Sequence, residues 1–252
     1  MIKTISFIGS GNVATRFAIE FRSVGIKINN IFSRNQLTGK KLAKRVNASY
    51  INNIKDLNKC DLIMICVNDD NIKDIISILP NTLIVHTSGC TTLDVFAGKK
   101  NYGVIYPVQT LTKDNKVDFK KVPICIEGNS KNTENKLSNL ASKISKQIHI
   151  INSQSRKLLH LAAVISCNFS NYCYLIAHNI LDEKNIDFKI LQPLIKHTAE
   201  KNIQNPPYDN QTGPARRGDL ITINHHLELL KNKKYKKIYK LLSESIIKEY
   251  EK

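Results

Sequence analysis

Short apolar runs alternate with predicted helices along the first half of the chain. The runs are too short for buried helices and too continuous for strands with one face in water, so they suit the centre of a parallel sheet. They occupy residues 2–8, 26–32, 48–51, 62–67, 83–86, 103–106, 122–126 and 149–151. Helical segments are expected between several of them, at 13–24, 37–46, 72–79 and 133–146. This rhythm predicts an α/β fold with a doubly wound parallel sheet, whose ligand lies over the carboxyl ends of the strands.

The chain beyond residue 153 contains helical patterns alone. The expected helices span about 158–181, 188–204, 220–230 and 235–250, and no low-complexity linker precedes them. We therefore predict two domains packed directly against each other. Residues 1–153 form the sheet domain, and residues 154–252 form a smaller all-α domain.

The segment 158–181 has no Asp, Glu, Lys or Arg and is long enough to span a bilayer. Its other polar side chains are too many for lipid, so we predict that it does not cross a membrane. At about 100° per residue, four of them fall on one helical stripe. These are His160, Asn168, Asn171 and His178. The stripe should face a ligand, the other domain or a partner subunit, although bonds to neighbouring helices would also satisfy it.

The turn after the first predicted strand has the pattern G-x-G-x-x-A, in Gly9-Ser10-Gly11-Asn12-Val13-Ala14. Gly9 permits a tight turn, Gly11 leaves room for a pyrophosphate, and the small Ala14 lets helix and strand pack closely. The N–H groups at the start of the following helix attract an anion. An ordinary turn with two glycines is the alternative. The strand before the turn and the helix after it favour a dinucleotide site.

The second predicted strand ends in Ser33 and Arg34, where such a site meets the adenosine ribose. An acidic residue there would bind a free 2′-hydroxyl, whereas a hydroxyl, a guanidinium and the nearby Lys40 and Lys41 suit a 2′-phosphate. We therefore expect NADP(H) rather than NAD(H), with an ordinary basic loop as the alternative. The loops after the next two central strands should lie beside the nicotinamide. They contain Val67 and Asn68, and Ser88 and Gly89.

The 252-residue chain has a formal charge of +17 and a pI near 9.6. Its lysines are scattered, and no nucleic-acid-binding motif accompanies the one dense cluster, at 231–237. Nucleic-acid binding is therefore disfavoured. We interpret the positive charge as the source of an electrostatic field that attracts anionic ligands. The six cysteines show no zinc-ligand spacing, so we expect no metal. With no signal peptide before the first strand, we expect a reducing, cytoplasmic location.

A long loop at 205–219 is dense in Pro, Gly and polar residues, which is typical of a functional segment. Arg216 and Arg217 within it can hold a substrate carboxylate bidentately. Asp219 can also serve as the N-cap of the next helix, and the two roles are compatible.

Together these residues resemble Rossmann-type NADP oxidoreductases related to ketopantoate reductase and pyrroline-5-carboxylate reductase. The best resemblance is to the family with a carboxy-terminal helical domain of unknown function 2520. It covers nearly the whole chain and rests on several motifs. They are the glycine motif, His86-Thr87-Ser88-Gly89, Tyr106-Pro107-Val108-Gln109-Thr110, the helix from His160 to Asn168, and Thr212-Gly213-Pro214 with Arg217-Gly218-Asp219. These motifs are more specific for the family than for a substrate.

The resemblance implies reduction of a small 2-oxo acid, with ketopantoate as the leading candidate. Ketopantoate reductase relatives use a lysine and an asparagine on the first helix of the second domain, where this sequence has His160 and Asn168. His160 would donate the proton and Asn168 would orient the carbonyl. Gln109, Asn171 and the two arginines complete the expected substrate contacts.

The sequence is compatible with two other functions. One is reduction of a cyclic imine, as in pyrroline-5-carboxylate reductase. The other is a non-catalytic NADP(H)-binding sensor or scaffold. Since relatives pair through the helical domain, the resemblance also implies a homodimer.

Overall fold

The computed structural model describes residues 1–114 and 117–251. The chain divides into two compact units, Met1–Ile165 and Ser166–Lys252. The predicted domain boundary at residue 153 lies at the start of helix α5 (Ser153–Ala163), which belongs to the first unit.

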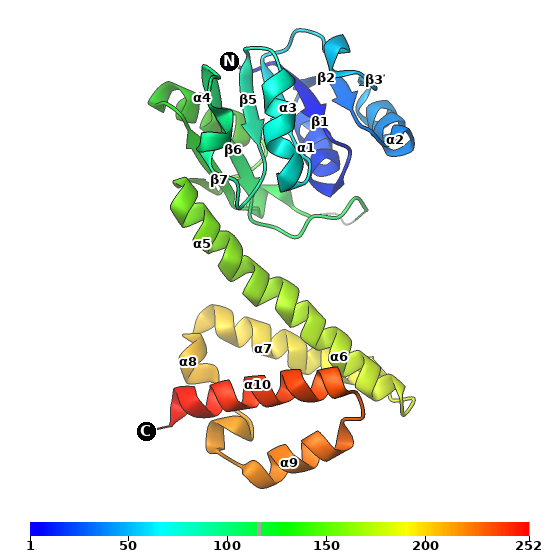
Figure 1. The fold of residues 1–252 in the computed structure, drawn as a ribbon, viewed down its shortest axis with the longest axis vertical. Coiled ribbons are helices and arrows are strands. Elements are labelled where there is room, and N and C mark those ends of the chain that lie inside the picture. Colours follow the sequence, from blue (N-terminus) through cyan, green and yellow to red (C-terminus); the bar gives the residue numbers. More distant parts are fainter. Residues whose placement is uncertain (115–116, 252) are drawn as a thin grey trace. The chain divides into compact units, whose positions relative to one another are not determined.

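In the part of the chain that the structure describes, the first unit is built on one eight-stranded sheet with the order β3-β2-β1-β4-β5-β6-β7-β8 (Figure 1). The strands are β1 (Thr4–Ile8), β2 (Lys27–Phe32), β3 (Ser49–Ile51), β4 (Leu62–Ile65), β5 (Leu83–His86), β6 (Asn101–Pro107), β7 (Ile124–Gly128) and β8 (Ile148–Ile150). The strand order reverses between β1 and β4, which is the switch point at which such sheets bind ligands. The predicted fold class is confirmed.

The direction of the last two strands differs from the prediction. β1 to β6 are parallel, but β7 is antiparallel to β6, and β8 is parallel to β7. Two consecutive strands can pair in parallel only if a crossover connection, usually a helix, carries the chain back to the end of the sheet where the first strand began. The described residues between β6 and β7 hold only the short 3₁₀ turn Phe119–Lys121. The expectation of an all-parallel sheet is therefore wrong at β7 and β8.

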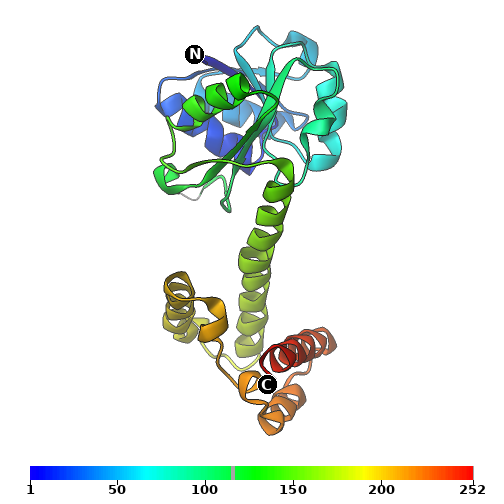
Figure 2. The same cartoon turned by 90° about the vertical axis from the view of Figure 1, so that its left-hand side faces the viewer.

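Helices cover both faces of the sheet. α1 (Asn12–Ser23), α2 (Gln36–Val46) and α4 (Lys131–Ala141) lie on one face, and α3 (Ile72–Ile78) lies on the other. Figure 2 shows α3, in cyan, across the sheet from α4, in green. Phe17 and Met64 are fully buried on the first face, and Ile84 and Phe96 on the second. Burial on both faces explains the continuous apolar runs of the central strands.

The described residues of the second unit form helices joined by loops. The helices are α6 (Ser170–Asp182), α7 (Gln192–Gln204), α8 (Pro207–Asn210), α9 (Leu220–Leu229) and α10 (Lys233–Tyr250). α10 packs against α9 and against the 3₁₀ turn Ala215–Arg217. Within the described residues of this unit, only Ile223 and Ser243 are buried. The second unit therefore has almost no core of its own.

The helix predicted at 158–181 forms, but its spacing is not regular. α5 is followed directly by a π-helical turn at Val164–Phe169, and α6 follows that turn. A π-helical turn closes its hydrogen bonds over one residue more than an α-helical turn. The step of about 100° per residue is therefore not kept, and the expectation of a single regular polar stripe is wrong.

The helical run Ser153–Asp182 passes a test of length and composition for a membrane span. Its most apolar window has a mean hydropathy of 1.2, and none of that window is buried within the chain. One such helix is weak evidence for a span, because a helix that packs on protein passes the same test.

Helix α5 is fastened to the sheet by Arg156, whose side chain is fully buried. Its guanidinium pairs with the carboxylate of Glu127 on β7 and donates to the backbone carbonyl of Thr91. Glu127 also accepts hydrogen bonds from the backbone N–H and the hydroxyl of Ser153, both at 2.8 Å. These charge-assisted bonds fix the start of α5 against β7 and the loop after β5.

We expect Arg156→Met to lower the free energy of unfolding by about 3–5 kcal/mol, because it leaves the Glu127 carboxylate without its cation. Lys131→Met is the matched control, since it removes an exposed ion pair with Glu134 of 3.2 Å and should cost less than about 1 kcal/mol. Urea denaturation followed by circular dichroism measures both. Equal small losses would show that Arg156 is not an anchor.

Candidate active site

The glycine turn predicted from the sequence lies between β1 and α1. Gly9 has a φ of 115°, and a Cβ there would lie 2.2 Å from the carbonyl oxygen of Cys66. Only glycine fits at this position, because a side chain would collide with backbone. A Cβ on Gly11 would meet no described atom within 4 Å, so the space beside it is open. α1 begins at Asn12 without a side-chain cap in the described structure, which leaves its first N–H groups for an anion.

This turn borders a cavity of about 440 Å³ at the carboxyl ends of β1, β2 and β4. Part of the predicted cofactor set lines it: Gly9, Ser10, Gly11, Ser33, Arg34, Val67 and Asn68. Asn12, Val13, Ser88 and Gly89 are outside this lining. Sequence reasoning missed the apolar wall made by Phe32, Ile54 and Ile75. Their apolar character was the available signal, but it does not distinguish a cavity wall from a core.

A hydroxyl cluster joins the glycine turn to the loop after β2. Ser10 and Ser33 are both buried, with their Oγ atoms 2.8 Å apart. Ser10 Oγ also lies 2.7 Å from Thr38 Oγ1 on α2. Asn35 caps α2 by accepting a hydrogen bond of 3.0 Å from the backbone N–H of Thr38. Arg34 is exposed between these anchored residues.

These features fit a dinucleotide with a 2′-phosphate. The open space at Gly11 and the uncapped start of α1 suit a pyrophosphate. The end of β2 presents Ser33, Arg34 and Asn35, none of which is acidic, and the one carboxylate among the described lining residues is Asp74 of α3. The residues of this edge therefore match NADP(H) in both charge and shape.

Ser88 joins the loop after β5 to the loop after β4. Its hydroxyl donates to the carboxylate of Asp69 at 2.8 Å and accepts from the backbone N–H groups of Cys90 and Thr91 at 3.0 and 2.9 Å. Because one donor and two acceptor sites are used, this hydroxyl holds the loop in place.

His160 on α5 contacts both the loop after β5 and strand β6. Its Nδ1 lies 2.9 Å from the hydroxyl oxygen of Tyr106, and the two rings meet at 79°. A Cβ on Gly89 would lie 2.6 Å from the imidazole, so the ring fits only because residue 89 has no side chain. Sequence reasoning named the motif around Tyr106 but missed this contact.

Tyr106 is 8% exposed. Burial is the main cause that raises the pKa of Tyr106 to about 12. The neighbouring thiols of Cys125 and Cys90 add to this increase, and Arg156 opposes it. The phenol therefore keeps its proton near neutral pH.

A second histidine at this edge, His86, is part of the protein core. It is fully buried and stacks on Phe96 with ring centroids 5.4 Å apart. Its Nδ1 accepts a hydrogen bond of 3.2 Å from the backbone N–H of Ser88. Burial, with a contribution from Arg156, lowers the pKa of His86 to about 3, so it stays neutral and is a poor source of protons.

Several predicted substrate residues lie in the second unit. Asn168 is exposed in the π-helical turn, and Asn171 is exposed in α6. The guanidinium carbon of Arg216 lies 4.2 Å from the centroid of the Tyr250 ring, which orients that side chain by stacking. Arg217 is exposed beside it in the same 3₁₀ turn.

Two further residues that the sequence singled out have clear local roles. Asp219 caps α9 by accepting a hydrogen bond of 3.0 Å from the backbone N–H of Thr222, as the sequence suggested. Gln109, in the first unit, is exposed after β6, and its side-chain oxygen accepts a bond of 2.9 Å from the backbone N–H of Thr110.

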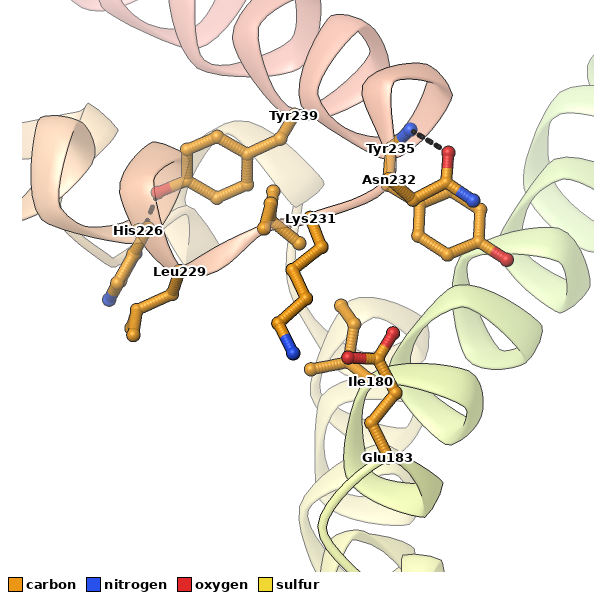
Figure 3. Close-up of a pocket in the computed structure, with 9 residues that line it drawn as sticks. Ile180, Glu183, His226, Leu229, Lys231, Asn232, Tyr235 and Tyr239 are labelled. Atoms are coloured by element: carbon orange, nitrogen blue, oxygen red, sulfur yellow. Dashed lines mark hydrogen bonds between the residues drawn. The ribbon is translucent and has the colours of Figure 1, made fainter.

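Figure 3 shows a cavity of about 210 Å³ inside the second unit. Apolar side chains such as Ile180 and Leu229 line it, and His226 Nδ1 lies 2.8 Å from the Tyr239 hydroxyl at its edge. None of the predicted site residues belongs to its lining. The cavity is therefore separate from the predicted chemistry.

Two family models match the chain. Residues 4–88 match the model described as NADP oxidoreductase, coenzyme F420-dependent, and residues 122–246 match the domain of unknown function 2520. Among solved structures, a protein of Bacteroides fragilis described as an NADP oxidoreductase is 35% identical to this chain. The match covers 98% of each of the two chains and has a TM-score of 0.92. The chain belongs to this family of NADP oxidoreductases. It is therefore an NADP(H)-dependent oxidoreductase, and the expected cofactor is confirmed.

More distant members of the comparison share the fold. A reductive aminase of Aspergillus terreus in complex with NADPH and ethyl-5-oxohexanoate is 14% identical, covers 99% of this chain and 95% of its own, and has a TM-score of 0.76. An imine reductase of Myxococcus stipitatus in complex with NADP⁺ is 14% identical, covers 97% and 92%, and has a TM-score of 0.66. No curated protein sequence matches the chain.

We expect Gly9→Ala to weaken NADPH binding roughly tenfold or more, because the new methyl group must displace the Cys66 carbonyl and with it the turn. Gly98→Ala is the control. Gly98 also has a positive φ, of 84°, but no described atom lies within 4 Å of its would-be Cβ, and it does not line the cavity. Titration of NADPH fluorescence measures both affinities, and a Gly9→Ala protein with unchanged affinity would contradict the assignment of the turn.

Proposed function

We propose that this NADP(H)-dependent enzyme reduces the carbonyl of a small 2-oxo acid, with ketopantoate as the first candidate. The observation that best supports a catalytic role is the position of the His160 side chain. It is a partly buried imidazole held by Tyr106 and Gly89 at the carboxyl edge of the sheet that also bears the cofactor cavity. A titratable ring seated at this edge is suited to acid–base chemistry.

NADPH, when bound, supplies a hydride. The oxygen of a reduced carbonyl gains negative charge and needs a proton, which we assign to His160. We assign orientation of the carbonyl to Asn168 and further substrate contacts to Gln109 and Asn171. Arg216 and Arg217 are proposed to hold the carboxylate, since a guanidinium binds it with two parallel hydrogen bonds.

For the cofactor, Ser33 and Arg34 are proposed to recognise the 2′-phosphate. The segment from Gly9 to Val13 is assigned to the pyrophosphate. We assign the loops with Val67 and Asn68, and with Ser88 and Gly89, to the nicotinamide side. The backbone of residue 88 is the more suitable contact, because the hydroxyl of Ser88 already has three partners.

Reduction of an imine is the second candidate. The fold relatives described as reductive aminase and imine reductase favour it. An imine takes a hydride at its carbon and a proton at its nitrogen, just as a carbonyl takes a hydride at its carbon and a proton at its oxygen. A sensor or scaffold role would require NADPH binding without turnover. We place the enzyme in the cytoplasm, and the six free cysteines are compatible with a reducing compartment.

Purified protein is expected to oxidise NADPH, followed at 340 nm, with one member of a panel of 2-oxo acids and cyclic imines. His160→Ala should lower kcat about 10²- to 10⁴-fold, the usual range for a general acid. His149→Ala, on β8 outside the described site, is the matched control and should leave kcat unchanged. NADPH binding without reduction of any compound would favour the sensor role.

We also propose a homodimer in which α5, α6 and the rest of the second unit are covered by the second copy. Large apolar side chains are exposed along this helical run, including Leu158 at 68%, Leu161 at 55% and Phe169 at 59%. A patch of this kind normally contacts another protein. The apolar cavity of Figure 3 and the scarcity of buried residues in the second unit favour the same arrangement.

Light scattering is expected to give a mass twice the 28.6 kDa of the chain. Phe169→Glu should shift the protein toward the monomer, since it introduces a charge into an apolar interface. Leu37→Glu is the control, because Leu37 is 80% exposed on α2 in the first unit. A monomeric mass for the unchanged protein would contradict the dimer.

A further inference from the structure

We propose that Tyr106 is a positioning residue that keeps the proton of His160 on Nε2, the ring nitrogen remote from Tyr106. The inference rests on the proposed function, in which His160 gives a proton to the reduced substrate. It concerns the protonation pattern of the ring, which is a property of the free protein.

The buried hydroxyl of Tyr106 needs an acceptor. Tyr106 is 8% exposed, and a buried donor without an acceptor is costly. Among the described residues, the structure gives this hydroxyl one hydrogen bond, of 2.9 Å, to His160 Nδ1. An O–H that donates to Nδ1 requires a lone pair there, so the proton of the neutral ring is on Nε2.

The surroundings of Tyr106 keep it in the donating form. Besides His160, the titratable groups that act on it are Arg156 from α5, Cys125 from β7 and Cys90 from the loop after β5, and burial outweighs the attraction of the guanidinium. Arg156 is also paired with Glu127. The phenol therefore retains the proton that it donates to the imidazole.

Gly89 encloses the same side of the ring that Tyr106 contacts. The imidazole atoms closest to a Cβ on Gly89 would be Cγ at 2.6 Å and Nδ1 at 2.7 Å. The perpendicular ring of Tyr106 adds a second wall, with centroids 5.8 Å apart. The Nδ1 side of His160 is thus closed by protein, and Nε2, on the opposite edge of the ring, is the nitrogen available to a substrate.

A tyrosine hydroxyl suits this role in both protonation states of the ring. It donates to a bare Nδ1 in neutral His160 and accepts from Nδ1–H in the imidazolium. Proton transfer then breaks the Nε2–H bond of the imidazolium and forms the O–H bond of the alcohol. The ring is left neutral with its proton on Nδ1. Uptake of a solvent proton at Nε2 restores the imidazolium, and release of the Nδ1 proton to solvent then returns the ring to the neutral Nε2–H form.

The test is a long-range ¹H–¹⁵N spectrum of the full chain labelled with ¹⁵N-histidine, in which the signals missing from His160→Gln identify His160. At a pH where this ring is neutral, we expect the proton on Nε2 and a bare, hydrogen-bonded Nδ1. In Tyr106→Phe, an Nδ1–H population should appear. Tyr102→Phe is the matched control, because Tyr102 lies on the same strand but stacks on Phe96, and it should leave the His160 signals unchanged.

A proton found on Nδ1 in the unchanged protein would overturn the proposal, and this result does not depend on whether Tyr106→Phe folds. Unchanged His160 signals in a folded Tyr106→Phe protein would also overturn it. With a substrate in hand, Tyr106→Phe should lower kcat roughly tenfold to a hundredfold while the KM for NADPH is kept, the range for a residue that orients a functional histidine. If the Nε2–H form is observed but no carbonyl or imine is reduced, the proposed function fails and the assignment of Tyr106 stands.

Discussion

The buried guanidinium of Arg156 is the constraint on which the geometry of the first unit's site depends. A cation removed from water must be paired and hydrogen-bonded, and this one takes its partners from β7, from the loop after β5 and from the start of α5. His160 follows Arg156 by four residues and so lies on the same face of α5. The ion pair that anchors the helix therefore also directs the imidazole toward Gly89 and Tyr106.

Two close approaches shape the carboxyl edge of the sheet, where the cavity proposed for the cofactor and the imidazole of His160 lie. At one, Gly9 lies against the carbonyl of Cys66, so β1 and β4 are close together at the glycine turn. At the other, Gly89 lies against His160. Both glycines are required by contact with another segment, and Gly9 by its backbone angle as well. A methyl group on Gly9 would displace the carbonyl of Cys66, and one on Gly89 would displace the imidazole of His160.

Much of the fold and of the cavity lining could be predicted from the sequence, because the signals are local. Strand β5 and the glycine turn follow from neighbouring residues, and Ser33 and Arg34 line the cavity because they directly follow a recognisable strand. An apolar run does not encode its direction, so the antiparallel β7 was missed. The π-helical turn at Val164–Phe169 has no distinct composition. The contact between Tyr106 and His160 joins residues 54 positions apart, beyond any periodic pattern.

The helical part shows a different limit of sequence patterns, which leads to the proposed dimer. Amphipathic spacing identifies an apolar face but not the chain that covers it. In the first unit such faces meet the sheet, and Phe17 of α1 and Leu137 of α4 become fully buried. In the second unit Leu194 of α7 is 61% exposed and Leu241 of α10 is 64% exposed. Helices of this composition gain most of their stability from packing, so in the proposed dimer a second copy would cover these side chains and fix the segments of Asn168 and Arg216.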